Sequence, residues 1–199
     1  VDIMLRTLML VFSFAFFINQ SAVFGDTMLA SNHILLQLIS FSAFFLDGYA
    51  FVVEALIGNA VGAKRKDIFD IAVRRSTILA LITAIFLASI ILLLGGNILL
   101  LLTDIAAVNL AANHLLPFAA LYVLLSFAAF QLDGIFIGAS CTRQMRDAAA
   151  LSITVYLCAW WVLSDQYGVQ GLWGAMIIYV VARAIALLLF YPALRRSVA

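Results

Sequence analysis

The sequence consists of long apolar stretches that short polar or glycine-containing segments separate. A membrane-spanning helix needs about 20 consecutive, mostly apolar residues, and only helices and closed barrels satisfy their backbone groups inside a bilayer. The alternating ten-residue pattern of a transmembrane barrel does not occur, so helices are predicted. The pattern indicates an all-α integral membrane protein, a single six-helix bundle over residues 1–199. Its predicted spans are at about residues 3–24, 28–60, 72–94, 114–140, 148–163 and 171–191.

Two of these predicted spans have unusual limits. The second is longer than a bilayer requires, so a tilt, a kink or a protruding end is expected. The third is predicted to stop at Gly95-Gly96-Asn97, with residues 98–113 forming a connector or a short helix at the membrane interface.

Composition agrees with a membrane protein, because 66% of the residues are apolar and 11% are charged, with a mean hydropathy of +1.17. Soluble domains have about 45–50% apolar and about 25% charged residues. The basic residues form no single basic surface, so nucleic acid is not an expected partner, and the two cysteines indicate neither a metal site nor a disulfide framework. Because the chain starts at Val1 and has no signal-peptide pattern, we expect a fragment or one lobe of a longer protein.

The basic residues predict the orientation of the bundle. Threading six spans places ten of the eleven lysines and arginines on one side, and cytoplasmic segments carry the excess of basic residues. Both termini are therefore predicted to be cytoplasmic. The ten residues are Arg6, Lys64, Arg65, Lys66, Arg74, Arg75, Arg143, Arg146, Arg195 and Arg196.

Four ionisable residues remain as candidates for chemistry inside the spans: Asp47, Glu54, Asp133 and Arg183. A charge at mid-bilayer costs at least about 2.5–3.5 kcal/mol on insertion scales, and such residues usually face a bundle interior or a wet cavity. Burial disfavours the charged form of a carboxyl group, which allows proton exchange near neutral pH. The alternative is that Arg183 or a hydroxyl group neutralises these carboxylates, which then only hold helices together.

Helical spacing places polar residues on shared faces of two spans. Ser40, Asp47 and Glu54 are seven residues apart and share one face, and Tyr122, Ser126 and Asp133 share a face of the fourth span. Such polar stripes are typical of helices that line a hydrated path, or of helices that contact each other through polar groups. Asn19 and Gln20 either line the path near the outer face or lie at the membrane interface.

A short segment of the second span recurs in the fourth. Residues 43–48 (Ala-Phe-Phe-Leu-Asp-Gly) and residues 129–134 (Ala-Phe-Gln-Leu-Asp-Gly) agree at five of six positions. Both copies are predicted to lie mid-span. A Gly-xxx-Gly pattern accompanies each copy, at Gly58 and Gly62 and at Gly134 and Gly138, and this pattern permits close helix packing.

The chain resembles the carboxyl-terminal lobe of the multidrug and toxin extrusion (MATE) transporters, in their bacterial DinF-like branch. The resemblance implies one lobe of a twelve-helix antiporter in the bacterial inner membrane, whose partner is an amino-terminal six-helix lobe. Its implied substrates are amphipathic, often cationic compounds that leave in exchange for protons, with sodium as the alternative. The matching segments are residues 2–6, 46–55, 58–64, 132–139 and 142–146, together with Arg183.

The resemblance also bears on individual residues. Asp133 falls where family members carry an acidic residue linked to cation coupling, and Asp47 is typical of the DinF-like branch. The first span lacks the further acidic residue of the sodium-type members, so a full sodium site is not expected. The Asp to which proton coupling is usually assigned would lie in the other lobe.

These observations predict a carrier with no enzymatic activity and no cofactor besides its coupling ion. Asp47 and Asp133 are the predicted titrating or cation-contacting pair, with Glu54 and Arg183 adjusting their charge state. The predicted supporting residues are Ser40, Tyr122, Ser126, Asn19 and Gln20.

The sequence leaves two alternatives to a carrier lobe. One is a non-transporting scaffold or a half-size homodimeric carrier. The other is an intramembrane aspartyl protease, because two buried Asp residues can share a proton. The Tyr-Asp and Gly-x-Gly-Asp contexts of such proteases do not occur, which makes a protease the weakest reading.

Overall fold

The protein folds into long α-helices in a computed structural model that describes residues 1–198. Each of the five helices is long and apolar enough to cross a membrane. This confirms the all-helical class predicted from the apolar pattern. The helices are α1 (Asp2–Ala22), α2 (Asp26–Gly62), α3 (Lys66–Leu102), α4 (Ala106–Gly138) and α5 (Thr142–Ser197).

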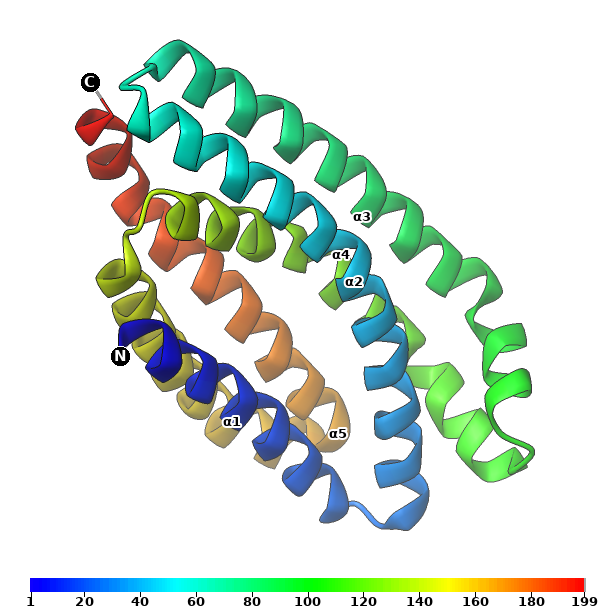
Figure 1. Cartoon of the computed structure of the whole chain (residues 1–199). Helices are drawn as coiled ribbons and strands as arrows, with labels where there is room; N and C mark the ends of the chain where they lie inside the picture. The colour runs from blue at the N-terminus through cyan, green and yellow to red at the C-terminus, as the bar shows by residue number, and fades with distance from the viewer. Residues whose placement is uncertain (199) are drawn as a thin grey trace.

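Helix α5 reverses direction at Gly168, which has a non-helical backbone with φ 56° and ψ −127°. Glycine adopts positive φ without the steric cost that a side chain brings. The arm over residues 142–167 runs beside α1, and the arm over residues 169–197 returns through the bundle (Figure 1). The two arms touch where the rings of Tyr156 and Tyr179 lie with centroids 5.5 Å apart. Helix α5 is therefore a helical hairpin.

The connector predicted at residues 98–113 is wrong, because α3 continues through both glycines to Leu102 and α4 begins at Ala106. The glycines act in packing. A Cβ on Gly95 would lie 2.8 Å from Leu116 Cδ2, and one on Gly96 would lie 3.0 Å from Asn113 Oδ1. The absence of side chains there lets α3 approach α4 closely. The helices exceed several predicted spans, and the limits of the membrane-embedded segments stay a prediction.

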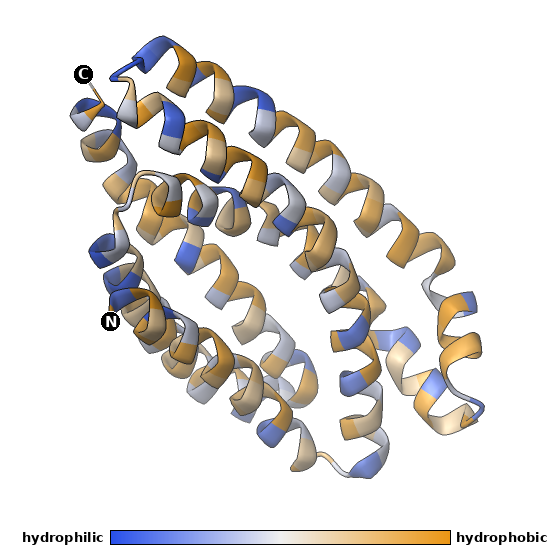
Figure 2. Cartoon of the chain, in the orientation of Figure 1, coloured by the Kyte–Doolittle hydropathy of each residue, from blue (hydrophilic) through white to orange (hydrophobic). Residues whose placement is uncertain are grey.

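Helix α4 is the centre of the bundle, and α2, α3 and α5 pack around it. Helix α1 packs mainly against α5 and more lightly against α2. Apolar residues dominate the helices, whereas hydrophilic residues gather at their ends and at a few inner positions (Figure 2). Many large apolar side chains remain exposed, for example Leu93 at 80% and Phe44 at 75%. Lipid or another protein surface must cover such side chains, because patches of this extent are unusual on soluble monomers.

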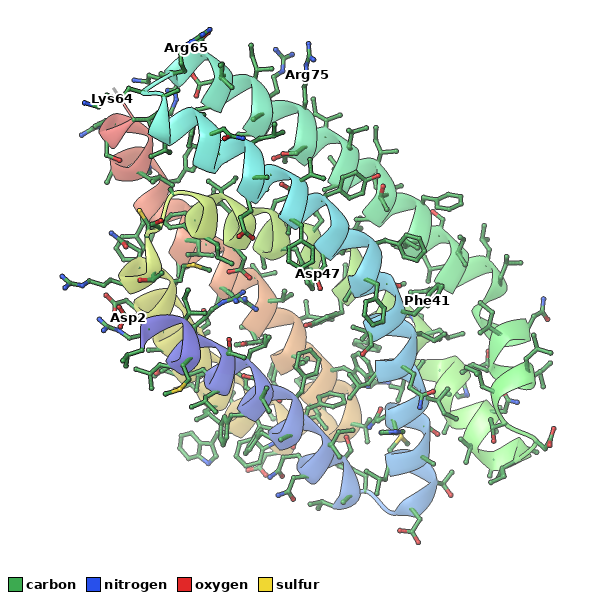
Figure 3. The ribbon with its side chains drawn as sticks, viewed as in Figure 1. Asp2, Phe41, Asp47, Lys64, Arg65 and Arg75 are labelled. Atoms are coloured by element: carbon green, nitrogen blue, oxygen red, sulfur yellow. The ribbon has the colours of Figure 1, made fainter. Side chains whose placement is uncertain are left out.

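The two termini lie at the same end of the bundle, and the carboxyl-terminal end of α5 lies close to the basic turn that contains Lys64 and Arg65 (Figures 1 and 3). Ion pairs join helices there. Arg195 of α5 donates two hydrogen bonds to Asp70 of α3, at 2.7 and 2.6 Å. This pair accompanies the continuation of α5 beyond the predicted end at Tyr191, through Pro192 to Ser197.

Candidate functional site

A cavity of about 460 Å³ lies between α1, α2, α4 and the returning arm of α5. Its walls combine charged and polar groups with aromatic rings, among them Phe14, Phe44, Phe51 and Phe130. The cavity brings together six of the nine residues predicted from the sequence. Those six are Ser40, Asp47, Glu54, Tyr122, Asp133 and Arg183.

Helix α2 contributes its predicted polar stripe to this cavity. Ser40 is exposed, and Asp47 and Glu54 are half-buried, at seven-residue intervals on one face. Asp47 lies part-way along the helix (Figure 3). Within residues 1–198, neither Asp47 nor Glu54 has an ion-pair partner within 4 Å. Two carboxylates thus reach the cavity without a bound counter-charge.

Asp133 of α4 is in a different situation, because two guanidinium groups bind it. Arg6 of α1 and Arg183 of α5 each donate a hydrogen bond from Nη2 to the same oxygen, Asp133 Oδ2. The exposed fractions of Asp133 and Arg183 are 7% and 8%. Asp133 thereby connects three helices, and Arg183 pairs with one of the carboxylates that the sequence offered as its partners.

Arg6 is the site residue that sequence reasoning missed. It was counted among the basic residues at the cytoplasmic ends, but its side chain is only 15% exposed and lies against Asp133. A signal was available, because Arg6 falls inside the first predicted span. A cation within an apolar span needs a partner, and that partner is the carboxylate at position 133.

Two glycines of α4 place Asp133 beside the face of α2 that carries Asp47. A Cβ on Gly134 would collide with the carbonyl oxygen of Ala50, and one on Gly138 would collide with that of Glu54. Their absence permits backbone contact between the helices, as expected for Gly-xxx-Gly. By contrast, a Cβ on Gly62 would meet nothing within 4 Å.

The two copies of the repeated segment lie at different positions along their helices, and their placement mid-span in a membrane stays a prediction. Helix α4 ends at Gly138, five residues after Asp133. Helix α2 ends at Gly62, fifteen residues after Asp47. The two carboxylates share a cavity because α4 crosses α2 near its own carboxyl end, at the level of Ala50.

Three of the predicted supporting residues lie outside this cavity. Ser126 is 2% exposed, and its hydroxyl donates to the carbonyl of Val123 at 2.8 Å. Asn19 is exposed and Gln20 is half-buried, both near the end of α1. The structure therefore does not bring these three side chains together with the carboxylates.

A second buried polar cluster, near the opposite end of α1, was not predicted. The amide of Asn32 donates to the hydroxyl of Ser21 at 3.0 Å, and its oxygen accepts from Trp173 Nε1 at 2.9 Å. Asn32 and Ser21 are fully buried and joined by hydrogen bonds, so this cluster ties α1, α2 and α5 together. Among residues 1–198, no group of three or more His, Cys, Asp or Glu side chains is arranged to hold a metal ion.

Comparison with known proteins explains this arrangement of helices. The profile of the family described as MatE matches residues 3–162. The chain belongs to the MatE family. This confirms the resemblance inferred from the Leu-Asp-Gly segments and their neighbours.

A curated relative and two solved structures give the scale of the likeness. The DNA damage-inducible protein F of Escherichia coli K12 is 32% identical over 195 residues, which cover 94% of this chain and 40% of that protein. The MATE transporter VcmN of Vibrio cholerae, in its bent form, superposes with a TM-score of 0.89 at 19% identity, covering 99% of this chain and 45% of that one. The eukaryotic MATE transporter AtDTX14 gives 0.81 at 17% identity, covering 94% and 43%.

The TM-scores show the fold of this MatE chain, and the coverages show its length relative to these relatives. It spans about 40% of the curated relative that it matches and less than half of each transporter structure. More than half of each of these relatives therefore has no counterpart in the matched segment.

Proposed function

We propose that this chain is one lobe of an efflux antiporter that exports amphipathic or cationic compounds in exchange for protons, a role that involves no enzymatic step. Membership of the MatE family supports transport. The observation that carries the cationic preference is the cavity itself, where Asp47 and Glu54 have no ion-pair partner within residues 1–198 and aromatic rings stand beside them. Aromatic faces attract organic cations, and carboxylates supply the opposite charge.

In this proposal the two aspartates have different roles, one structural and one in exchange. Two guanidinium groups already compensate the charge of Asp133, which in this conformation holds α1, α4 and α5 together. Asp47 is free to bind a cation when ionised and to release it when protonated. Because one carboxylate cannot hold a proton and a cationic substrate at once, binding of one displaces the other, which is antiport.

The partner in this proposal is an amino-terminal six-helix lobe that covers the open side of the cavity. The two arms of α5 make six membrane spans possible from five helices. In this proposal the end of the bundle that holds both termini and the basic turn faces the cytoplasm. A bacterial inner membrane is the proposed location. The proposed coupling ion is the proton, and sodium is the alternative that an ion-replacement experiment distinguishes.

A transport assay on the full-length protein tests this proposal. Ethidium, an amphipathic cation, would be added outside inverted membrane vesicles. Its accumulation inside them would be driven by a proton gradient or by a sodium gradient. We expect Asp47→Asn to abolish proton-driven accumulation, because an amide neither binds the cation nor exchanges a proton. Asp165→Asn, at an exposed position outside the cavity, is the matched control.

Three outcomes would overturn part or all of the assignment. Wild-type coupling in both Asp47→Asn and Asp133→Asn would remove the roles given to these residues. A wild-type protein that transports nothing under either gradient would favour the non-transporting scaffold. Accumulation driven by sodium alone would replace the proton as the coupling ion.

A further inference from the structure

Arg6 enters the cavity from α1 and reaches a carboxylate on α4, although α1 packs mainly against α5. We propose that Arg6 is the resident cation of the cavity, and that it sets by electrostatic competition how many positive charges an incoming ligand can carry. The inference rests on the proposed binding of cations and adds to it a residue that determines specificity.

The negative charge of Asp133 is neutralised without Arg6. Arg183 is buried in the bundle and pairs with the same oxygen of Asp133 that Arg6 uses. The second guanidinium therefore adds a positive charge that this carboxylate cannot balance alone. Arg6 is also incompletely bound, because its Nε is buried and has no hydrogen-bond partner within residues 1–198. A buried donor without a partner is unfavourable, so Arg6 is held there mainly by charge.

Two carboxylates on another wall of the cavity, Asp47 and Glu54, balance the positive charge that Arg6 adds. Asp47 and Glu54 are the carboxylates there without an ion pair among residues 1–198, and α3 contributes no side chain to the lining. Two arginines against three carboxylates leave a formal charge of −1, and without Arg6 it would be −2. The titratable and charged groups that share the cavity with Asp47 are Arg6 from α1, Glu54 from α2, Tyr122 and Asp133 from α4, and Arg183 from α5.

This charge count determines which ligands fit. A singly charged organic cation brings the cavity to neutrality, whereas a doubly charged one leaves an excess positive charge. With Arg6 present the cavity favours monocations, and its moderate attraction permits release on the other side of the membrane. Removal of Arg6 should strengthen the binding of every cation, and of dications most, because each ligand charge gains separately from the loss of the repulsion.

Equilibrium binding to the purified full-length protein tests this inference without any gradient. The probes are ethidium, a monocation, and propidium, a dication with the same ring system, followed by fluorescence anisotropy. We expect Arg6→Gln to raise the affinity for ethidium about fivefold and for propidium about twentyfold at low ionic strength. The gain should shrink as salt is added. Arg6→Lys should restore wild-type values, because it keeps the charge.

The matched control is Arg146→Gln. Arg146 pairs with Asp2 at the start of α1, at 2.8 Å, and lies outside the cavity. Its loss loosens the same helix and leaves the cavity charge unchanged, so both dye affinities should stay at wild-type values. A purely structural role of Arg6 would instead make the two glutamine variants behave alike.

A second variant keeps the test decisive if Arg6→Gln does not fold. Glu54→Gln removes one negative charge from a residue that has no ion pair in the described part of the chain. It should weaken propidium binding more than ethidium binding. Equal affinities in Glu54→Gln and wild type overturn the inference, as does an equal gain for both dyes in Arg6→Gln. Absence of dye binding to the wild type overturns it as well. Charge-dependent binding without transport would count against the proposed antiport alone.

Discussion

The two Leu-Asp-Gly segments of this chain are nearly identical in sequence and opposite in their surroundings. In α2, Asp47 is half-buried without an ion pair among the described residues, and a Cβ on Gly48 would meet nothing within 4 Å. In α4, Asp133 is 7% exposed and bound by two guanidinium groups, and Gly134 lies against the backbone of Ala50. One copy presents a free carboxylate to the cavity, and the other joins helices.

The difference shows that the position of a helix in the bundle decides what a motif does. Helix α4 lies at the centre, whereas α2 presents one side outward. The non-identical position in the motif reflects this, because Phe45 is 47% exposed whereas Gln131 is 2% exposed. Gln131 exchanges two hydrogen bonds with Ser76 of α3, each at 3.3 Å.

The largest expected difference between the copies is in the cost of removing the carboxylate. Asp133→Asn removes the counter-charge of the buried Arg183 and the partly buried Arg6, and breaking a buried ion pair typically costs about 3–5 kcal/mol. Asp47→Asn breaks no ion pair among residues 1–198, so the free energy of unfolding should change by less than about 0.5 kcal/mol. Thermal unfolding of the purified full-length protein in detergent measures both. Equal melting temperatures for the two variants would contradict the division of roles.

The second-largest expected difference is in the effect on stability of replacing the glycine of each copy, Gly134 and Gly48, by alanine. Gly134→Ala places a Cβ against the Ala50 carbonyl and forces α2 and α4 apart, at a cost of about 1–3 kcal/mol. Gly48→Ala meets open space, and alanine is favoured in a helix by about 1 kcal/mol. The same unfolding measurement should therefore show destabilisation for Gly134→Ala and none for Gly48→Ala. Destabilisation by Gly48→Ala of the same size would show that both copies are closely packed.

The smallest expected effect concerns the non-identical position. Gln131→Leu removes both hydrogen bonds to Ser76, and the loss of a buried hydrogen-bonding side chain costs about 1 kcal/mol. Phe45→Leu keeps an exposed apolar side chain and should leave the melting temperature almost unchanged. A wild-type melting temperature for Gln131→Leu would mean that these long hydrogen bonds contribute no stability.

Much of the fold and of the site was predictable from local pattern. Long apolar runs predict helices because a bilayer leaves the backbone no other partner for its polar groups. The seven-residue spacing of Ser40, Asp47 and Glu54 places them on one face whatever that face meets. The predictions failed where the answer depended on a neighbour. Gly95 and Gly96 were interpreted as a helix end, but they are the surface that Leu116 and Asn113 of α4 contact.

The same limit applies to the charges. A sequence shows that Arg6, Asp133 and Arg183 are costly in an apolar environment, but it does not show which of them meet. Pairing of Arg6 with Asp133 spans 127 positions in the chain. It depends on where α1 and α4 approach each other, and the local pattern of either helix does not determine that.

The class of the protein, its helical faces and the residues that need a partner follow from the amino-acid pattern, because hydrophobicity, helical period and the cost of buried charge are local properties. The packing of the helices is what makes Asp133 compensated and leaves Asp47 without an ion pair among residues 1–198. That outcome depends on the distance between groups on different helices, since Coulomb energy falls with separation and with the polarity of the surroundings. Two copies of one motif thus became an ion-pair junction at Asp133 and an open carboxylate at Asp47.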